Sequence, residues 1–515
     1  MSTLSLDTPL LVIGAGIMGA GIAQVAAQAG HPVWLYDLRE GAAAQALDKL
    51  AGGLQALEAK GKLAAGQAQA IAARIRVAGT LEDAAGAGLV VEAIVENVGA
   101  KRSLFAQLEG LLSPDAILAT NTSSISITAI AQGLKRPRQV VGMHFFNPVP
   151  LMKLVEVVSG LETAPAVAEA IHALASAWGK TAVHARSTPG FIVNRIARPY
   201  YAETWALLQE QAATPAAIDA ALRGAGFRMG PCELMDLIGH DTNLAVTESV
   251  YQANYGDKRF QPSLLQRELV DGGLLGRKSG RGFYDHAAGA ATPVLNAAPT
   301  APVTGPVEVH GGCAFAQRLA DGLRAAGITV EQDIGAPTVG LRWATGRLEV
   351  TDGRPALQRA AEAGVADSAV FDWVVADPAA GVRGALAFAV APSASDSFAA
   401  QAAGLLAALG WQPLRVADAP GLIVARTIAM LINEAADAVQ QAVCAPDAAD
   451  AAMKLGVGYP AGPFEWLQRV GVGPVVELLD RLDQHYRGER YRVSPWLRRA
   501  HWQARAPQSP ARHAG

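Results

Sequence analysis

The sequence predicts an α/β domain with a helical-hairpin insertion, followed by an all-α domain, a degenerate α/β segment and a second copy of the all-α domain. Three observations predict this order. A short apolar strand, a glycine-rich turn and a helix occupy residues 10–29, and apolar strand candidates then alternate with helical stretches. From about residue 188 the pattern becomes helical. The string S-T-P-G-F-I-V-N-R-I at 187–196 returns as D-A-P-G-L-I-V-A-R-T at 418–427, which indicates an internal repeat.

Length and composition indicate a folded, multidomain protein. The 515 residues correspond to three or four domains, and 51% hydrophobic against 17% charged residues favours large cores over disorder. A net charge of −3 gives no long-range attraction to nucleic acid or anionic membranes. The N-terminus lacks the features of a signal peptide and no apolar run is long enough to span a membrane, so we expect a cytoplasmic protein. Cys232, Cys313 and Cys444 form no metal-binding spacing, and we expect three small core residues and no metal site.

The first elements form a βαβ unit with a glycine fingerprint. A strand at 10–14 and a helix from about Met18 to Ala29 flank Gly14, Gly16 and Gly19, which have the G-x-G-x-x-G spacing of a Rossmann-type dinucleotide-binding turn. The first glycine allows the tight turn, the second lets the backbone approach a pyrophosphate, and the third lets helix and strand pack closely.

Asp37 ends the second strand, which covers residues 33–36. An acidic side chain there accepts hydrogen bonds from ribose hydroxyls and repels a 2′-phosphate, which favours NAD over NADP. The neighbouring Arg39 weakens this preference. The alternative is an ordinary glycine turn followed by a solvated aspartate.

Residues 40–78 are rich in Ala, Leu, Gln and Lys and lack strand signals, so we expect a helical hairpin inserted in the sheet domain. Four apolar strand candidates follow, each ending near a polar cluster: Gly88–Ala93, Ala116–Ala119, Val140–Gly142 and Leu154–Val158. Ligands of open α/β sheets bind at the carboxyl ends of the strands, so these clusters are the site candidates.

Two of the clusters have competing interpretations. Glu92 and Glu96 with Lys101 fit a loop beside the nicotinamide half of a cofactor, but the pattern alone favours a helix carboxylate and a surface lysine. Asn121–Ser124 follows a strand, yet such a string is more often a helix cap or a turn.

His144, in M-H-F-F-N-P-V-P, and Glu156, in K-L-V-E-V-V, carry the predicted chemistry. A histidine in an apolar run is usually a buried core residue. A carboxylate bonded to one imidazole nitrogen changes this, because it orients the ring, stabilises the imidazolium and leaves the other nitrogen as a base. Asn194 has two interpretations, an amide that satisfies a helix backbone group or a donor to a substrate oxygen.

The domain limits follow from these patterns. In the second copy Ala425 replaces Asn194, so we expect function in the first copy and a scaffold in the second. The segment with V-E-V-H-G-G lacks the fingerprint and is not expected to bind NAD. The predicted parts are the NAD-binding domain 8–187, the first helical copy 188–286, a Pro/Ala/Thr/Gly-rich linker 287–306, the degenerate Rossmann-like domain 307–411 and the second helical copy 412–503.

Six strings occur in order over residues 8–285: V-E-A-I-V-E-N, N-T-S-S, H-F-F-N-P-V-P, K-L-V-E-V-V, T-P-G-F-I-V-N-R and G-F-Y-D. Together they resemble the L-3-hydroxyacyl-CoA dehydrogenase family. The duplicated helical copy resembles that of long bacterial members, such as the enzymes for 3-hydroxyadipyl-CoA in phenylacetate breakdown and long 3-hydroxybutyryl-CoA dehydrogenases. The resemblance implies NAD-dependent oxidation of a (S)-3-hydroxyacyl-CoA to the 3-oxoacyl-CoA.

The resemblance also implies residue roles. His144 would be the general base with Glu156 as its partner, and Ser123 and Asn194 would hold the C3 oxygen of the substrate. Lys60 and Ser123 would contact CoA, while Gly53 stands where some members have a contacting serine. The implied NAD contacts are Gly14, Gly16, Ile17, Met18, Gly19, Asp37, Glu96, Lys101, Ser123, Asn147 and Lys278.

Other readings remain open. The first is a dehydrogenase for a hydroxy acid without CoA, for which Arg195 or Arg198 near Asn194 could bind a free carboxylate. The second is a non-catalytic NAD-binding structural protein. The acyl chain, the physiological direction, the oligomeric state and any ligand of 307–411 are not determined by the sequence. We hypothesise that the duplicated helical domain replaces a dimer contact within one chain.

Overall fold

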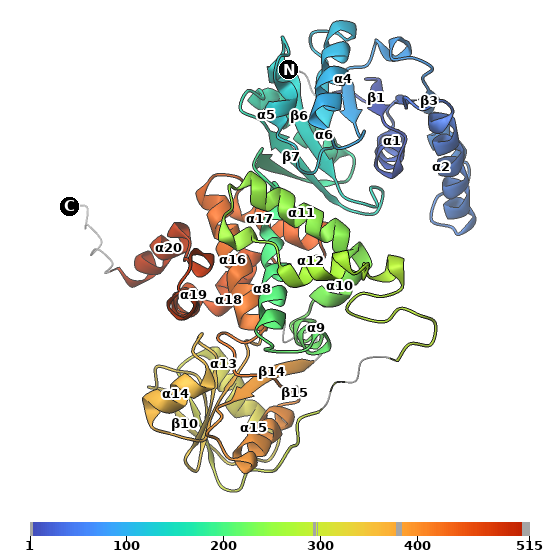
Figure 1. Cartoon of the computed structure of the whole chain (residues 1–515). Helices are drawn as coiled ribbons and strands as arrows, with labels where there is room; N and C mark the ends of the chain where they lie inside the picture. The colour runs from blue at the N-terminus through green and yellow to red at the C-terminus, as the bar shows by residue number, and fades with distance from the viewer. Residues whose placement is uncertain (1–3, 292–294, 296, 377–383, 507–515) are drawn as a thin grey trace, which may run out of the picture. The chain divides into compact units, whose positions relative to one another are not determined.

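A computed structural model describes residues 4–291, 295, 297–376 and 384–506 (Figure 1). The chain divides into two compact units. The first contains residues 1–195 together with 441–457, and the second contains residues 196–440 and 458–515. A segment of the second helical copy therefore belongs to the same unit as the N-terminal sheet. Of the predicted linker 287–306, residues 292–294 and 296 lie outside the described residues.

The first unit is built on one mostly parallel sheet. Its strand order is β3-β2-β1-β4-β5-β6-β7-β8, and in the described residues every neighbouring pair is parallel except β6 with β7. The chain reverses direction across the sheet at β1, which places the glycine turn at a topological switch point, the usual place for a ligand. The strands are β1 (Leu10–Ile13), β2 (Val33–Tyr36), β3 (Ile75–Val77), β4 (Leu89–Glu92), β5 (Ile117–Thr120), β6 (Val140–Phe145), β7 (Leu154–Ser159) and β8 (Thr181–Arg186).

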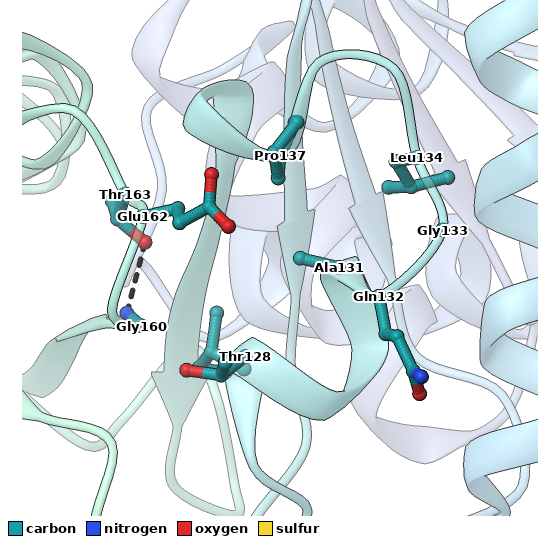
Figure 2. Close-up of a pocket in the computed structure, with 10 residues that line it drawn as sticks. Thr128, Ala131, Gln132, Gly133, Leu134, Pro137, Gly160, Glu162 and Thr163 are labelled. Atoms are coloured by element: carbon teal, nitrogen blue, oxygen red, sulfur yellow. Dashed lines mark hydrogen bonds between the residues drawn. The ribbon is translucent and has the colours of Figure 1, made fainter.

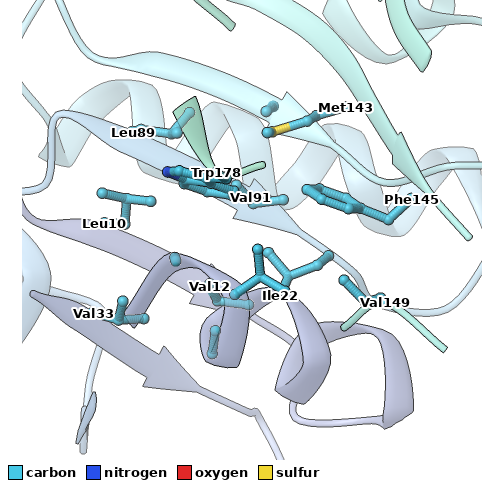
Figure 3. Packing of buried hydrophobic residues seen from close by; sticks show 14 of the residues in the cluster. Leu10, Val12, Ile22, Val33, Leu89, Val91, Met143, Phe145, Val149 and Trp178 are labelled. Atoms are coloured by element: carbon cyan, nitrogen blue, oxygen red, sulfur yellow. The ribbon is translucent and has the colours of Figure 1, made fainter. Parts of the chain in front are cut away.

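The core of this unit lies between the sheet and its helices. Val12 and Val91 of the central strands pack with Ile22 of the first helix, and Trp178 closes the same cluster (Figure 3). The central strands are buried along their whole length, which explains why they are continuous apolar runs. The helices are α1 (Ile17–Ala29), α2 (Ala42–Ala59), α3 (Gln67–Ala72), α4 (Val98–Leu111), α5 (Ile127–Ala131) and α6 (Pro165–Ala177), and α7 (Val193–Ile196) begins in this unit.

Three details of the predicted sheet were wrong or missed. The expected hairpin at 40–78 is formed by α2 and α3, but its last residues form β3, in which only Ile75 is buried. The edge strand β8 was missed because charged and exposed residues interrupt its apolar pattern. The predicted strand 154–158 forms β7, but it runs antiparallel to β6, so its carboxyl end does not join those of the parallel strands.

The second unit contains most of both helical copies. Helix α8 packs along α16, and in this way the two copies form one helical body. Copy one has α8 (Arg198–Gln209), α9 (Pro215–Gly224), α10 (Pro231–Ile238), α11 (His240–Ala253) and α12 (Leu264–Asp271). Copy two has α16 (Val424–Gln440), α18 (Pro463–Val470), α19 (Val472–Tyr486) and α20 (Pro495–Arg505) here, whereas α17 (Pro446–Gly456) belongs to the first unit.

A second, mixed sheet has the order β10-β9-β11-β12-β13-β14-β15. The turn after β9 keeps a glycine with positive φ, Gly311 at 113°. Cys313 in this turn is exposed, which contradicts the expectation of a core residue; Cys232 and Cys444 are buried. The strands are β9 (Val307–His310), β10 (Val330–Asp333), β11 (Gly340–Trp343), β12 (Gly346–Val350), β13 (Ser368–Phe371), β14 (Ala385–Val390) and β15 (Gln412–Arg415), and the helices are α13 (Ala314–Ala325), α14 (Ala356–Ala363) and α15 (Asp396–Ala408).

Among the described residues, every helix is too short or too polar to cross a lipid bilayer.

Candidate active site

The glycine turn between β1 and α1 has the geometry of a dinucleotide site. Gly14 has φ +100°, and a Cβ there would lie 2.4 Å from the carbonyl oxygen of Ala93. A Cβ on Gly19 would lie 1.7 Å from the carbonyl oxygen of Gly14, so only glycine allows this strand and helix to approach. Around Gly16 nothing lies within 4 Å of the Cβ position. This open space at the N-terminus of α1 fits a pyrophosphate.

Asp37 closes the same turn from the end of β2. Its Oδ2 accepts a hydrogen bond of 2.7 Å from the backbone N–H of Ala15, and its Oδ1 lies 3.1 Å from Nε of Arg39. Burial opposes ionisation, but the hydrogen bonds from Arg39 and Ala15 hold the pKa of Asp37 below its usual value. The carboxylate is therefore charged, as an acceptor for ribose hydroxyls must be, while the exposed Arg39 partly offsets its charge.

Glu96 organises the loop after β5. Its Oε1 accepts hydrogen bonds from the hydroxyl of Thr122 at 2.6 Å and from the backbone N–H groups of Ser123 and Ser124 at 2.9 and 3.1 Å. The Ser123 hydroxyl also lies 3.4 Å from this oxygen. The string N-T-S-S is thus a loop held by a carboxylate, and the helix cap of α5 is Ser126 instead.

Lys101 is buried between two carboxylates. Its Nζ lies 2.6 Å from Oε1 of Glu92 and 3.4 Å from Oε2 of Glu96, and its side chain is only 1% exposed. The expectation of a surface lysine is therefore wrong. Although burial raises the pKa of Glu96, its hydrogen bond from Thr122 and the charge of Lys101 bring it below the usual value. The loop consequently depends on an ionised Glu96.

His144 and Glu156 lie opposite each other on β6 and β7. They are directly paired in the sheet register, and His144 Nδ1 lies 2.7 Å from Glu156 Oε2. Both side chains are buried. Among the described residues we find no hydrogen bond to His144 Nε2, so this nitrogen is left to exchange a proton. The ring centroids of Phe146 and Phe191 lie 4.6 and 5.8 Å from that of the imidazole, and these rings shield it from water.

The second oxygen of Glu156 anchors the start of the helical domain. Oε1 accepts hydrogen bonds from the backbone N–H groups of Ile192 and Val193, at 3.1 and 2.9 Å. Asn194 follows in the first turn of α7 and is half-buried. One carboxylate therefore connects the imidazole with the turn that carries Asn194, an arrangement that the sequence spacing did not reveal.

Asn121 belongs to a candidate cluster, but no role of its own was predicted for it. Its Oδ1 accepts a hydrogen bond of 2.8 Å from the backbone N–H of Phe145, and this bond ties the end of β5 to the end of β6 beside His144. The available signal was its place directly after a buried strand.

A groove of about 490 Å³ runs from the glycine turn to the inserted helix α2. Gly16 and Ile17 line one part of it, and the turn Asn147–Pro150 lines another. Arg39 and Lys49 supply cations, and Lys49 was also not predicted. The predicted CoA residue Lys60 is exposed at the end of α2 and does not line the groove, and neither does Gly53, which stands where some family members have a contacting serine.

The predicted residues divide between the two units. Ser123, His144, Glu156 and Asn194 belong to the first unit, with the glycine turn, Met18, Asp37, Glu96, Lys101 and Asn147. Lys278 belongs to the second, where its Nζ lies 2.6 Å from Oδ2 of Asp241.

A second cavity of about 210 Å³ lies between α5 and the loop at Gly160–Thr163 (Figure 2). At its edge the backbone N–H of Gly160 donates a hydrogen bond to Oγ1 of Thr163. Its lining includes none of the predicted site residues, and we assign no role to it.

The second sheet contains a counterpart of the His144–Glu156 pair that lacks both residues. The backbone N–H of Asp372 donates to the carbonyl of Ala387, and Ala387 pairs with Leu414 as Glu156 pairs with Val183. Val183 precedes the Pro-Gly of the first repeated string by the same number of residues as Leu414 precedes that of the second, so the two residues correspond. Ala387 therefore occupies the position of Glu156, and Asp372 occupies that of His144.

The Asp372 carboxylate nevertheless performs the anchoring that Glu156 performs in the first unit. It accepts hydrogen bonds from the backbone N–H groups of Ile423, Val424 and Ala425, at 2.9, 2.7 and 2.7 Å. The second sheet thus keeps the anchor but has an aspartate in place of the imidazole of His144.

A doubly wound sheet, a glycine turn closed by a charged aspartate and a buried His–Glu pair are the features of an NAD-dependent oxidoreductase. Comparisons with known families agree. The family model of the 3-hydroxyacyl-CoA dehydrogenase NAD-binding domain matches residues 10–188, and that of the C-terminal domain matches residues 190–286 and 421–511. A model named the 3-hydroxybutyryl-CoA dehydrogenase reduced Rossmann-fold domain matches residues 348–420.

Two of the similar proteins match nearly the whole chain, and a third matches its N-terminal half. The chain is 44% identical over 488 residues to 3-hydroxyadipyl-CoA dehydrogenase of Escherichia coli K12, covering 95% of this chain and 96% of the relative. A crystal structure of 3-hydroxybutyryl-CoA dehydrogenase from Escherichia coli K12 is 42% identical, covers 97% of this chain and 99% of its own, and has a TM-score of 0.87. A probable 3-hydroxybutyryl-CoA dehydrogenase of Bacillus subtilis is 45% identical over 278 residues, 54% of this chain and 96% of the relative.

The chain belongs to the 3-hydroxyacyl-CoA dehydrogenase family. The predicted fold, the NAD cofactor and the assignment as an oxidoreductase are confirmed by these matches.

Proposed function

We propose that the protein oxidises (S)-3-hydroxyadipyl-CoA to 3-oxoadipyl-CoA with NAD. The observation that carries the reaction type is the buried pair His144–Glu156, 2.7 Å apart, in the sheet that carries the glycine turn. The identity of the acyl group is inferred from the name of the relative that matches 95% of this chain. The alternative substrate is 3-hydroxybutyryl-CoA, the compound for which other relatives are named. An NAD-binding protein without activity is the remote alternative, and the intact His144–Glu156 pair opposes it.

We assign the roles at the reacting carbon as follows. His144 Nε2 takes the proton of the C3 hydroxyl in oxidation and returns it in reduction. Glu156 fixes Nδ1 as the protonated nitrogen and stabilises the imidazolium. Ser123 and Asn194 hold the C3 oxygen as its charge changes. Positioning by these groups and exclusion of water by Phe146 supply the rest of the rate enhancement.

When bound, NAD supplies the hydride acceptor. We propose that Gly14, Gly16 and Gly19, with Ile17 and Met18, bind its pyrophosphate, and that Asp37 binds the adenosine ribose. The open space at Gly16 and the charged Asp37 support this assignment. Further proposed contacts around the nicotinamide half are Glu96, Lys101, Ser123, Asn147 and Lys278.

The phosphates of CoA need cations. The groove between the glycine turn and α2 offers Arg39 and Lys49, and Lys60 stands exposed at the end of α2. We propose that this side of α2 binds CoA, with Lys60 and Ser123 among the contacts.

The test is NADH consumption with acetoacetyl-CoA and with 3-oxoadipyl-CoA at equal concentrations. A higher kcat/KM with 3-oxoadipyl-CoA supports the proposed substrate, and a higher value with acetoacetyl-CoA supports the alternative. Absence of turnover with both, while NADH still binds, overturns the proposal and favours a non-catalytic protein.

We further propose the domain limits 8–187, 188–286, 287–306, 307–411 and 412–503, a cytoplasmic location, and an internal duplication that replaces a dimer contact. The interleaving of residues 441–457 with the first unit supports the last of these. A monomer in sedimentation analysis is expected, and a tight dimer would contradict it. Cell fractionation tests the location.

A further inference from the structure

The second helical copy contributes a segment to the unit that contains the active site. Helix α17 packs on β7 and β8, and the backbone N–H of Arg186 at the end of β8 donates to the carbonyl of Val443. By sequence these residues belong to the second copy, whose remaining helices lie in the other unit. The first unit is therefore not complete without residues 441–456.

The segment contacts the turn anchored by Glu156. Gln441 Oε1 accepts a hydrogen bond of 2.8 Å from Nη1 of Arg195, the residue after Asn194. Arg195 is buried, with 3% of its surface exposed, whereas Gln441 is exposed, so this bond lies at the edge of the buried region. Cys444 is also buried, and the charge of Glu156 adds to the effect of burial in raising the pKa of this thiol to about 12. The thiol therefore stays neutral beside the carboxylate that orients His144.

The end of α17 packs on residues that surround the His144–Glu156 pair. Its last residue, Gly456, packs so closely that an added Cβ would lie 2.7 Å from Cδ2 of Leu154 and 3.0 Å from Cγ2 of Val193. The nearest atom of Phe146 would lie 3.7 Å away. Val193 donates its backbone N–H to Glu156, and Phe146 packs on the imidazole.

The second unit contains an equivalent contact, here called a joint, in which a segment of copy one packs against the repeated string of copy two. Arg426 stands at the place of Arg195 in the repeated string, and its Nη2 lies 2.9 Å from Oε1 of Glu210, which corresponds to Gln441. The backbone N–H of Ala417 donates to the carbonyl of Ala212, as that of Arg186 does to Val443. Helix α9 of copy one packs on β14 as α17 packs on β7. Each sheet thus packs against a helix from the other half of the sequence.

We propose that residues 441–456 of the second copy are a positioning element for the active site, and that Gln441 holds the Asn194–Arg195 turn in its productive place. The segment acts through Arg195, Val193 and Phe146 and does not touch the reacting atoms. The duplicated half therefore has a catalytic consequence although its own sheet has Asp372 and Ala387 at the places of His144 and Glu156. This inference rests on the proposed dehydrogenase function for its kinetic part only.

The first measurement is structural and needs no substrate. In Gln441→Ala we expect faster amide hydrogen exchange in peptides covering 187–196, because the amides of Ile192 and Val193 lose support. The matched control is Glu210→Ala at the corresponding joint, which should instead speed exchange in peptides covering 418–427. Unchanged exchange at 187–196 in Gln441→Ala overturns the proposal.

The second measurement is kinetic. Gln441→Ala should lower kcat by about 2–30-fold, the range for residues that act through a packed network, with little change in KM for NADH. Gln441→Glu should restore most of kcat, because a carboxylate can also accept the bond from Arg195. Glu210→Ala should leave kcat near the wild-type value. An equal loss of kcat in Glu210→Ala, or no rescue by glutamate, overturns a specific positioning role.

A second pair of variants separates a specific effect on the active site from general destabilisation of the protein. Gly456→Ala presses on Val193 and should lower kcat, whereas Gly473→Ala lies in the second copy with nothing within 4 Å of its Cβ position and should not. Equal kinetics of the two variants would count against the proposal. If the wild-type protein turns over neither 3-oxoacyl-CoA ester, the proposed function fails, while the exchange experiment still decides the positioning role.

Discussion

His144 and Glu156 are direct partners in the antiparallel register of β6 and β7, and 2.7 Å separates Nδ1 from Oε2. Antiparallel neighbours on one face of a sheet lie within reach of each other's side chains, so the strand pairing alone brings the carboxylate to the imidazole. The same carboxylate holds the start of α7 through Ile192 and Val193. The same carboxylate therefore contributes both to the orientation of the base and to the placement of Asn194.

His144→Gln should remove most turnover and leave NADH binding intact. Glutamine fills a similar space but cannot take the C3 proton, so we expect kcat to fall by about 10²–10⁴-fold, the usual contribution of a general base. Steady-state kinetics with acetoacetyl-CoA and fluorescence titration with NADH measure the two effects. Loss of NADH binding would show that His144 supports the fold.

Glu156→Gln should lower kcat on the order of tenfold or more, because a neutral amide no longer stabilises the imidazolium. The amide oxygen can still accept the backbone bond from Val193, so the protein should fold. The kcat–pH profile should also change shape relative to the wild type. A variant with wild-type kcat at every pH would refute the role of Glu156.

Asp372→Asn should destabilise the protein without lowering kcat. Both carboxylate oxygens of Asp372 accept backbone N–H groups, and an amide NH₂ facing such donors leaves them unpaired, at about 1–3 kcal/mol. Burial raises the pKa of Asp372 to about 6, despite its backbone hydrogen bonds. This folded value exceeds the unfolded value of about 3.9.

The pH dependence of this effect follows from the sign of that shift. Ionisation of Asp372 opposes folding, so its contribution falls as the pH rises from about 4 through 6. The stability difference between wild type and Asp372→Asn should therefore narrow between pH 4 and pH 7 in urea unfolding. A difference that widens over this range would contradict the prediction.

Glu96→Gln should show the opposite pH dependence. Hydrogen bonds from the loop and the charge of Lys101 outweigh burial and lower the pKa of Glu96, so its ionised form stabilises the fold. That contribution is present above the unfolded pKa of about 4.5 and is lost as the pH falls through the folded value. The stability difference between wild type and variant should be largest near neutral pH and shrink in acid. The variant should also have lower activity, because the Ser123 loop loses its anchor.

Asp37→Ala should weaken NADH binding and reduce the preference for NADH over NADPH. The carboxylate is a charged acceptor, and removing such a hydrogen bond corresponds to about 1.5–3 kcal/mol, or roughly 10–100-fold in affinity. Arg39 would then be free of its nearest carboxylate and could attract a 2′-phosphate. KM values for both cofactors measure the change, and an unaltered ratio would argue against the assigned ribose contact.

The sequence by itself determined the elements whose cause is local. Gly14 and Gly19 could be assigned because only glycine tolerates the strained turn and the close packing, and Asp37 because it ends the strand after that turn. The fold class and the internal repeat also followed from periodicity and from the returning string. The short strand β3 and the edge strand β8 did not, because few of their residues are buried.

Only the tertiary structure decided which distant residues meet. The pairing of His144 with Glu156, the burial of Lys101 and the anchoring of Val193 all depend on strand order and register. The sequence also gave no sign that residues 441–457 join the first unit, because the pattern of a helix records which of its faces is apolar and not which sheet that face covers. Neighbouring residues determine the local conformational preference of the chain, whereas the packing of the whole chain determines which distant residues come into contact.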